Sequence, residues 1–308
     1  MIDITLIGTA ALLPLPARAL TAVFLSCGGH SILFDCGEGT QSAARKAGVS
    51  LMRTDIIALT HYHGDHIFGL PGLLQTMMSM ERAEEPLYIV GPAGLEEAMA
   101  PILTLVGRTP YEIKLFEIPA EGLRLSELIS GWSEAAKLSA FKTEHRVSSQ
   151  GYVFTLERAG KFNPERAKEL GVPLNLWKVL QRGQSVQVGG EIILPEQVLG
   201  APRKGIKFVF TGDTSACESL IAAAAGADLL ICEGTYGENE QGEMALEYGH
   251  MNFAQAAAVA KNANAAELWL AHYSQMIVDP NQYLPNATAI FANTICGRDG
   301  MTKTLKFE

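Results

Sequence analysis

The 308-residue sequence lacks the features that mark membrane or exported proteins. No uncharged apolar run reaches the length of a membrane span, and the opening residues 1–8 form an alternating strand pattern without a basic leader. The five cysteines are odd in number and include no Cys-x-x-Cys pair, which favours reduced core thiols over a disulfide framework. These absences predict a soluble, unexported, cytoplasmic protein with no membrane partner.

Positive charge is also scarce, because 24 Lys and Arg residues face 33 Asp and Glu residues. The resulting net charge of −9 repels phosphate backbones on average. The charge is uneven, however, since residues 158–184 contain six basic and two acidic side chains, a local net of +4. Composition therefore restricts nucleic-acid binding to one segment of an otherwise ordinary globular chain.

Alternating and apolar segments predict a layered α/β fold. Strands are expected at 2–7, 22–26, 30–35, 55–60, 87–90, 112–118, 138–143, 151–156, 207–211, 228–232, 266–271 and 304–307. Helices are expected at 38–46, 70–80, 94–106, 216–224, 252–263 and 279–285. Residues 158–200 differ in composition, with several prolines and two short helical segments. We therefore expect one domain over residues 1–308, with 158–200 inserted as a protruding arm.

The hexapeptide His61-Tyr62-His63-Gly64-Asp65-His66 is the most informative segment. It follows the strand expected at 55–60, so a turn at the strand end gathers three imidazoles and a carboxylate. These groups are ligands of Zn²⁺ and similar metals, and Gly64 allows the loop to direct alternate side chains toward two ions. The alternative is a polar loop that is rich in histidine by chance, which the spacing disfavours.

Three further candidate ligands follow other expected strands, namely His145, Asp213 and His272. Strand ends on one edge of a sheet converge, so side chains from four strands can surround one site. Taken alone, each of these residues is more often a hydrogen-bonded loop residue than a ligand. Together with the hexapeptide they suit two metal ions. Zn²⁺, Mn²⁺ and Fe²⁺ all accept this ligand set, so the sequence leaves the metal open.

The order His-x-His-x-Asp-His, His, Asp, His resembles the metallo-β-lactamase superfamily, and within it the sequence is most similar to the ribonuclease Z family. The similarity extends almost end to end, over residues 6–9, 34–41, 60–72, 91–94, 145–152, 160–186 and 211–214. It implies the metallo-β-lactamase αβ/βα sandwich with an arm inserted at about 158–200. Most β-lactamase relatives lack such an arm, so residues 160–186 are the most discriminating segment.

The resemblance also implies site roles and partners. In that family's pattern, the first Zn²⁺ is held by His61, His63 and His145, the second by Asp65, His66 and His272, and Asp213 bridges the two ions of each subunit. Asp65 would orient and deprotonate the attacking water, while Glu233 would charge His250 to assist the leaving oxygen. Without Glu233, His250 would be an ordinary residue before a helix. The implied activity is endoribonucleolytic removal of the 3′ trailer from precursor tRNA, in a homodimer whose arm clamps tRNA for the other subunit.

Four positions depart from that family's pattern. The loop after the first strand keeps only Arg18 of a basic set, Leu174-Asn175 replace a Gly-Pro in the arm, and Ser215 and Met276 stand where arginines are common. Each change removes phosphate-contacting capacity and leaves the candidate metal ligands intact. The remaining candidates for RNA contact are Arg18, Lys161, Arg166, Lys168, Lys178 and Arg182.

Two other functions stay open. One is a dizinc small-molecule phosphodiesterase or esterase on the same scaffold, for which we expect the arm to fold over its own site. The other is a metal-binding RNA-interaction protein with little turnover, against which the retained Asp65, Glu233 and His250 argue. The basic residues of the arm also fit a solvated helical face.

Overall fold

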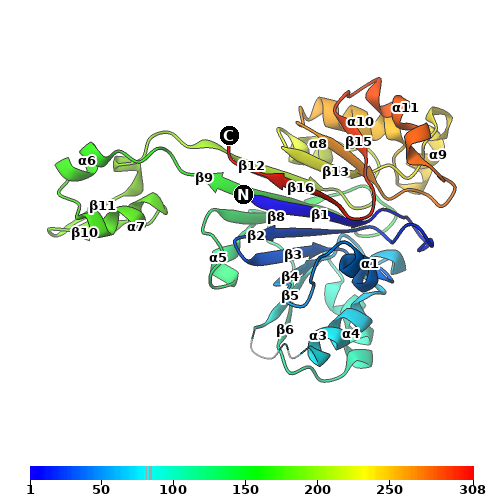
Figure 1. Cartoon of the computed structure of the whole chain (residues 1–308), viewed down its shortest axis with the longest axis horizontal. Helices are drawn as coiled ribbons and strands as arrows, with labels where there is room; N and C mark the ends of the chain where they lie inside the picture. Colours follow the sequence, from blue (N-terminus) through cyan, green and yellow to red (C-terminus); the bar gives the residue numbers. More distant parts are fainter. Residues whose placement is uncertain (81, 83–84) are drawn as a thin grey trace.

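The computed structural model describes residues 1–80, 82 and 85–308, and its main strands form two seven-stranded sheets (Figure 1). The first sheet has the order β16 (Met301–Leu305), β1 (Ile2–Gly8), β2 (Ala22–Cys27), β3 (His30–Phe34), β4 (Ile56–Ala58), β5 (Leu87–Val90) and β6 (Ile113–Phe116). The second has the order β15 (Thr294–Cys296), β14 (Leu268–Ala271), β13 (Leu229–Glu233), β12 (Arg203–Phe210), β9 (Gln150–Arg158), β8 (Ala136–Lys142) and β7 (Leu123–Arg124).

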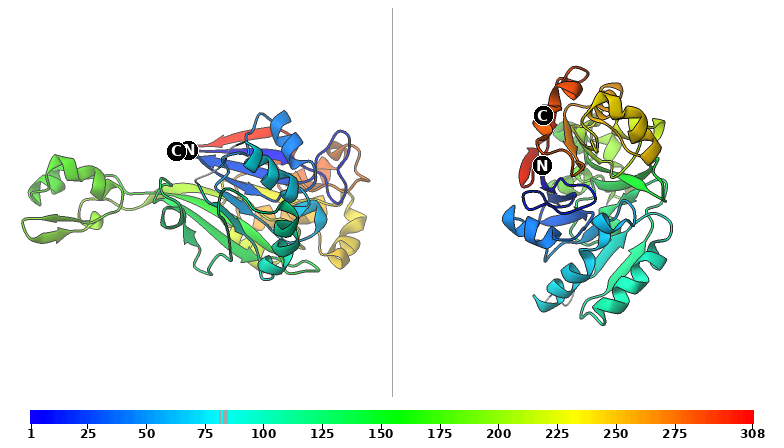
Figure 2. Two further views of the ribbon diagram at one scale, coloured as in Figure 1. Left: turned by 90° about the horizontal axis from the view of Figure 1, so that it is seen from below. Right: turned by 90° about the vertical axis from the view of Figure 1, so that its right-hand side faces the viewer.

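Helices cover the outer face of each sheet, as the two views of Figure 2 show. The helices of the first half are α1 (Thr40–Lys46), α2 (Gly64–Ile67), α3 (Leu70–Ser79), α4 (Leu95–Val106) and α5 (Leu125–Leu128). Those of the second half are α8 (Glu218–Ala224), α9 (Gly242–Tyr248), α10 (Phe253–Asn262) and α11 (Leu284–Thr288), with short 3-10 turns at η3 (Asn239–Gln241) and η4 (Pro280–Gln282). The layers are therefore helix, sheet, sheet and helix, which confirms the predicted αβ/βα sandwich.

Strand residues alternate between two apolar layers, which explains why the central strands are hydrophobic throughout. In β3, Ile32 and Phe34 face the second sheet, whereas Leu33 packs under the helices of the first half. Between the sheets, the ring centroids of Phe34 and Phe208 lie 5.8 Å apart. Burial on both faces fixes each strand's register, and with it the position of the residues at the strand ends.

The two sheets have a similar plan, which places several loops at one edge. Strands β3 to β6 are parallel, as are β12 to β15. The loops that follow β4, β12, β13 and β14 therefore leave from the carboxyl-terminal edges of these parallel strands. At this edge the Gln150 amide donates a hydrogen bond to the Thr60 carbonyl at 2.9 Å, which ties the second sheet to the first.

Most of the expected elements are confirmed, including the β2–β3 hairpin at Gly28-Gly29. Three predictions were wrong in their bounds. Strand β12 begins at Arg203 rather than at 207. The last strand is Met301–Leu305 rather than 304–307, because it pairs with β1 as soon as the turn at Gly300 ends. The helix expected at 279–285 is divided into η4 and α11. Elements of two to seven residues, namely α5, α9, β7 and β15, are too short to give a periodic signal.

Residues 159–202 project from the body as an arm (Figure 1). Its elements are α6 (Pro164–Glu169), η1 (Leu174–Leu176), α7 (Trp177–Gln181), β10 (Val186–Val188), β11 (Glu191–Ile193) and η2 (Pro195–Gln197). It has a small core of its own, formed by Ala167, Val172, Leu180, Val186, Ile193 and Val198. The ends of the arm lie side by side, since the Gly200 amide donates to the Lys161 carbonyl at 2.9 Å. The β10–β11 hairpin was not foreseen from the sequence.

Two expectations from composition can be compared with the structure. The five cysteines are free thiols, and Cys27, Cys36, Cys217 and Cys232 are buried while Cys296 is half-buried. Over the residues that the structure describes, there is no helix of the length and apolarity needed to cross a membrane.

Candidate metal centre

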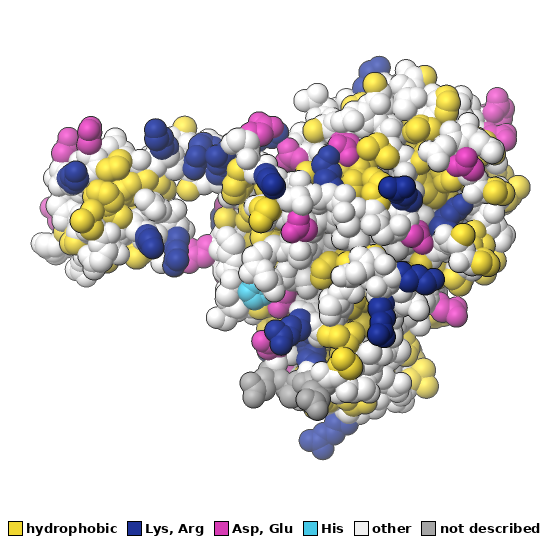
Figure 3. All heavy atoms as spheres, viewed as in Figure 1, with side chains coloured by type: hydrophobic (Ala, Val, Ile, Leu, Met, Phe, Trp, Pro, Cys, Tyr) yellow, Lys and Arg dark blue, Asp and Glu magenta, His cyan; other side chains and the backbone are white. Residues whose placement is uncertain are grey.

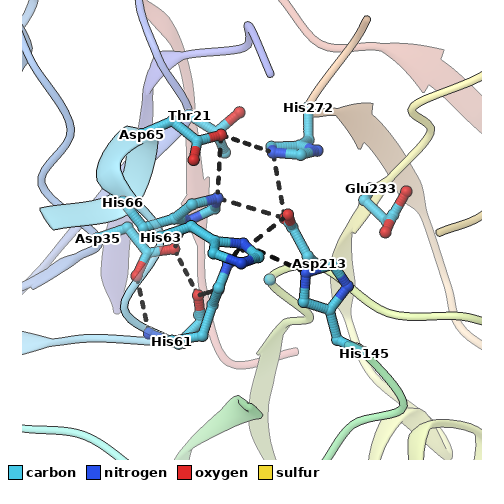
Figure 4. A network of polar contacts seen from close by, with 12 residues as sticks. Thr21, Asp35, His61, His63, Asp65, His66, His145, Asp213, Glu233 and His272 are labelled. Carbon is cyan, nitrogen blue, oxygen red and sulfur yellow. Dashed lines mark hydrogen bonds and ion pairs between the residues drawn. The ribbon is translucent and has the colours of Figure 1, made fainter. Parts of the chain in front are cut away.

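The seven candidate ligands lie together at the strand edge described above (Figure 4). Residues 61–66 follow β4, His145 follows β8, Asp213 follows β12 and His272 follows β14. Their ligand atoms fall into groups whose members lie within 4.8 Å of one another: His61, His63, His145 and Asp213; Asp65, His66 and His272; and Asp213, His250 and His272. The first two groups contain the ligand sets that the resemblance implied for two ions.

Asp213 lies between the two groups. Its Oδ1 is 3.1 Å from His272 Nε2 and 3.5 Å from His66 Nε2, while its Oδ2 is 3.8 Å from His61 Nε2. Within the described part of the chain, Asp213 Oδ1, His66 Nε2 and His272 Nε2 are buried without a hydrogen-bond partner. Unpaired buried polar atoms are costly, so three that converge on one point fit a bound cation. The residues present therefore fit the metal ions that the fold implies.

The ionisation of His61, His63 and Asp213 also suits metal binding. At His66 burial would lower the pKa, but the carboxylates of Asp213 and Asp35 outweigh it and raise this pKa well above its usual value. Burial lowers the pKa of His61 well below its usual value, and burial together with His145 lowers that of His63. Burial alone would raise the pKa of Asp213, but His272 and His66 outweigh it and hold this pKa well below its usual range. Neutral imidazoles with a free lone pair and an ionised carboxylate are the forms that bind divalent metals.

The short helix α2 explains how one hexapeptide supplies both groups. His61 and His63 lie in the turn that was expected after β4, whereas Asp65 and His66 lie in α2, a short helix that was not predicted. The loop after β3 fits closely against α2. A Cβ at Gly37 would lie 2.0 Å from the Asp65 carbonyl oxygen, so only glycine allows this approach.

Asp35 contacts the cluster through His66, and the sequence analysis assigned no role to it. It is buried directly after β3, and its Oδ2 lies 2.8 Å from His66 Nδ1 while its Oδ1 accepts a 2.8 Å hydrogen bond from the Thr60 amide. A carboxylate on Nδ1 fixes the imidazole so that Nε2 faces the site. An acidic residue at the end of a strand that pairs with β4 was the available signal.

Glu233 and His250 form a pair beside the cluster. Glu233 is buried at the end of β13, and its Oε1 lies 2.9 Å from His250 Nδ1. Burial alone would lower the pKa of His250, but the Glu233 carboxylate outweighs it and raises this pKa to about 9. A ring nitrogen of His250 also lies within 4.8 Å of ligand atoms of Asp213 and His272. His250 can therefore hold a proton next to the metal site.

Two threonines orient this pair and were not foreseen. The Thr235 hydroxyl donates to Glu233 Oε2 at 2.6 Å and lies 3.2 Å from His272 Nδ1. The Thr214 amide donates to Glu233 Oε1 at 2.8 Å. A carboxylate with these donors has one fixed position, so it also fixes the imidazole of His250. No spacing rule distinguishes such threonines from the many others at strand ends.

The candidate RNA-contacting residues lie elsewhere. Arg18 is half-buried, and its Nη2 donates to the carbonyls of Ile277 and Val278 at 2.7 and 3.1 Å while its guanidinium stacks over Tyr273. Arg18 thus stabilises the loop after His272. These contacts do not support the expected contact between Arg18 and a substrate. Lys161, Arg166, Lys168, Lys178 and Arg182 are all exposed on the arm.

Trp177 belongs to the core of the arm. Its indole donates to the Val172 carbonyl at 3.0 Å, and its ring packs against Phe162 with centroids 5.2 Å apart. The ring therefore packs against the core of the arm.

Known proteins with this fold place the chain in a broad class. A family model described as "Beta-lactamase superfamily domain" matches residues 196–273, and one described as "Anti-Pycsar protein Apyc1" matches residues 2–103. The metallo-β-lactamase fold protein YhfI of Bacillus subtilis superposes with a TM-score of 0.68 over 98% of each chain, at 21% identity. Together these similarities show that the chain has the metallo-β-lactamase fold.

Sequence relatives narrow the class. The ribonuclease Z of Agathobacter rectalis is 42% identical over 308 residues, which cover 100% of this chain and 99% of the relative, and that of Lachnoclostridium phytofermentans is 40% identical over 310 residues. The short form of human tRNase Z superposes with a TM-score of 0.69 at 28% identity, over 99% of this chain and 100% of the human one. The chain belongs to the ribonuclease Z family, as the sequence resemblance indicated.

Proposed function

We propose that this chain is a metal-dependent endoribonuclease that removes the 3′ trailer from precursor tRNA. The observation that carries the proposal is the Glu233–His250 pair beside a cluster of seven candidate ligands, because hydrolysis of a phosphodiester needs both an activated water and a proton for the leaving oxygen. Family membership supports the same activity, since the relatives that match the whole chain are ribonucleases Z.

Two Zn²⁺ ions per subunit are the proposed cofactors. His61, His63 and His145 would hold one ion, Asp65, His66 and His272 the other, and Asp213 would contact both. When bound, the ions supply an activated water at neutral pH and neutralise charge on the scissile phosphate. The imidazole-rich donor set favours Zn²⁺ over Mg²⁺ or Ca²⁺, which prefer oxygen ligands alone.

Two residues of the chain, Asp65 and His250, would each carry out one of the two proton transfers. Water attacks phosphorus and gives up a proton toward Asp65, whose Oδ2 is also held by the Leu12 amide at 2.8 Å. The bond from phosphorus to the 3′ oxygen breaks as His250 donates its proton to that oxygen. The products are a tRNA with a 3′ hydroxyl and a trailer with a 5′ phosphate. Glu233 keeps the donor charged and oriented.

The position of the arm supports a homodimer. The arm precedes Arg203 at the start of β12, whereas Asp213 follows the end of this eight-residue strand. At about 3.3 Å per residue, the base of the arm lies roughly 26 Å from its own site, and the arm projects away from it (Figure 2). Its exposed basic residues, visible in Figure 3, are better placed to hold tRNA for the site of a second copy.

The same position speaks against the small-molecule alternative, for which the arm was expected to cover its own site. The charge of the arm gives more modest support, because Glu191 and Glu196 reduce the net charge of residues 158–200 to +2. The free cysteines support a reducing compartment such as the cytoplasm.

Incubation with a precursor tRNA that carries a 3′ trailer tests the proposal, with the cut mapped at single-nucleotide resolution. We expect one cut at the end of the acceptor stem, a dependence on added Zn²⁺ after chelation, and no cut by Asp65→Ala. If the wild type hydrolyses a small chromogenic phosphodiester and leaves the precursor intact, the small-molecule activity replaces the proposed one.

A further inference from the structure

Two segments meet beside the Glu233–His250 pair and expose groups that the mechanism above does not use. Gly249, which ends α9 with a φ of +73°, accepts a hydrogen bond at its carbonyl from His145 Nδ1 at 2.9 Å. A Cβ at Gly249 would lie 3.1 Å from the His145 Cα and 3.4 Å from the Arg146 amide nitrogen. Close packing at this glycine therefore joins residues 145–146 to residues 248–250.

The junction presents an arginine and a tyrosine together. The Arg146 guanidinium carbon lies 4.6 Å above the ring centroid of Tyr248, and both side chains are exposed, Tyr248 by 41%. Within the described residues, the Arg146 guanidinium has no hydrogen bond or ion pair to a protein group. One face of the guanidinium rests on the ring while its donors stay available to a ligand.

The pair lies on the His250 side of the metal site. Arg146 follows His145, whose ring centroid is 5.0 Å from that of His250, and Tyr248 precedes His250 by two residues. Tyr236 lies on the same side, with its ring centroid 6.4 Å from that of His250. Burial and Glu233 raise the pKa of Tyr236, and the positive charge of Arg146 opposes this effect.

We propose that Arg146, held by Tyr248, is a specificity-determining residue that binds the RNA phosphate next to the scissile one on the tRNA side. The proposal rests on the proposed function. His250 serves the leaving 3′ oxygen, so a group beside it faces the nucleotide that owns this oxygen and the phosphate preceding that nucleotide. A planar guanidinium fork matches phosphate oxygens, because its donors can form two parallel hydrogen bonds to them.

Kinetics on two substrates separate this subsite from the metal site. For a precursor tRNA, Arg146→Ala should raise KM about tenfold and change kcat by less than about twofold, because the contact is made equally in the ground and transition states. The slope of log Kd against log salt should fall by about 0.7, the value for one phosphate of a single strand. Hydrolysis of a small chromogenic phosphodiester should stay within about twofold of the wild type.

Four companion variants sharpen the test. Tyr248→Ala should raise KM by about threefold, because the guanidinium loses its support, whereas Tyr248→Phe should not. Arg146→Lys should recover part of the affinity. Arg53→Ala is the matched control, since Arg53 is exposed before β4, at the opposite end of that strand from the ligands.

Two results would overturn the subsite while the proposed function stands. One is an Arg146→Ala variant that cleaves precursor tRNA with unchanged KM and salt slope. The other is an equal loss on both substrates, which would show that Arg146 acts through the geometry of the metal site. A wild type that cuts no precursor tRNA would instead overturn the proposed function, and the subsite with it.

Discussion

The metal cluster and the arm differ in how they hold their functional side chains. In the cluster, His61 and His66 are buried, and His66 is fixed on one side by Asp35 and faces Asp213 on the other. On the arm, Lys178 and Arg182 are exposed on short helical turns around a core of six buried residues. The cluster is rigid and specific, whereas the arm presents charge that water screens.

This difference predicts different responses to mutation. Residues of the cluster act as one unit, so the loss of any one should cost most of the activity. Residues of the arm are proposed to act through long-range attraction to phosphates, so the effects of mutating them should be smaller, should add up and should depend on salt. A variant in the cluster leaves the arm unchanged, and a variant in the arm leaves the cluster unchanged, so the two contributions can be measured separately.

The largest effects are expected at the two proton-transfer residues. Asp65→Ala and His250→Ala should each lower kcat on precursor tRNA by about 10²-fold to 10⁴-fold, the range for loss of a general acid or base. Only Asp65→Ala should also lower the metal content, because His250 is paired with Glu233 rather than placed between the ions. Elemental analysis and single-turnover kinetics measure the two quantities.

Asp3→Ala is the control for this pair, since Asp3 is exposed on β1 and bonded to Thr304. Equal metal loss in both variants would reassign His250 as a ligand, in keeping with its place in a third group with Asp213 and His272.

Removal of the whole arm should have the next largest effect. Residues 162–199 can be excised by joining Lys161 to Gly200, because the backbones of these two residues are already hydrogen-bonded at 2.9 Å. We expect precursor-tRNA binding to weaken by roughly 10²-fold and to become less salt-dependent, since several phosphate contacts are lost. Hydrolysis of a small phosphodiester should not change. Fluorescence anisotropy and a chromogenic assay give the two readouts.

The excision must take the arm as a unit. A shorter deletion of residues 160–184 would leave Val186, Ile193 and Val198 without the helices that cover them, and exposed apolar surface would confuse the result. Unchanged tRNA binding by the excised protein would show that the arm is not an RNA-binding element.

The contrast also explains what could be predicted from the sequence. His61, His63 and Asp213 were found because imidazoles and carboxylates after apolar strands have few other uses, and because the periodic strands located the edge where they meet. The helix α2 was missed because four residues give no helical period, and because its close approach to Gly37 joins segments that are distant in the sequence. Local patterns therefore predict which candidate ligands lie together, and not the path of the backbone between them.

Residues that act through another residue were the ones missed. Asp35 and Thr235 have ordinary local sequences, and their roles depend on which strands lie side by side. The direction in which the Arg18 side chain points could not be predicted from the sequence either. Its donors bind carbonyls that are about 260 residues away in the chain. On the arm, the residue types indicated charge correctly, but only the packing showed that Trp177 is part of the core.

Asp35 allows a test of how rigid the cluster must be. Asp35→Asn keeps the size of the side chain and removes the negative charge beside His66 Nδ1, so the ring is a weaker ligand with a less fixed orientation. We expect metal affinity to fall by about tenfold, the lower end for loss of such a partner. Competition with a chelating dye measures the affinity. A variant with the affinity of the wild type would show that His66 needs no support from Asp35.

The smallest expected effect at neutral pH concerns Glu233, and it probes the cluster without removing any of its ligands. The folded-state pKa of His250 is raised to about 9, so the imidazole keeps its proton below that pH and loses it as pH rises through it. The rate should therefore fall on the alkaline side. In Glu233→Gln the carboxylate charge is absent, so the pKa of His250 should return toward its usual value of about 6.5. We therefore expect this fall to begin about two pH units lower and kcat near pH 7 to drop about fourfold. Measurement of kcat from about pH 6 to about pH 10 decides between the outcomes. Glu238→Gln, at an exposed position, is the matched control. If kcat of the variant falls at the same pH as kcat of the wild type, Glu233 orients His250 without setting its charge. The fall at high pH would then not report the proton that His250 gives to the leaving oxygen.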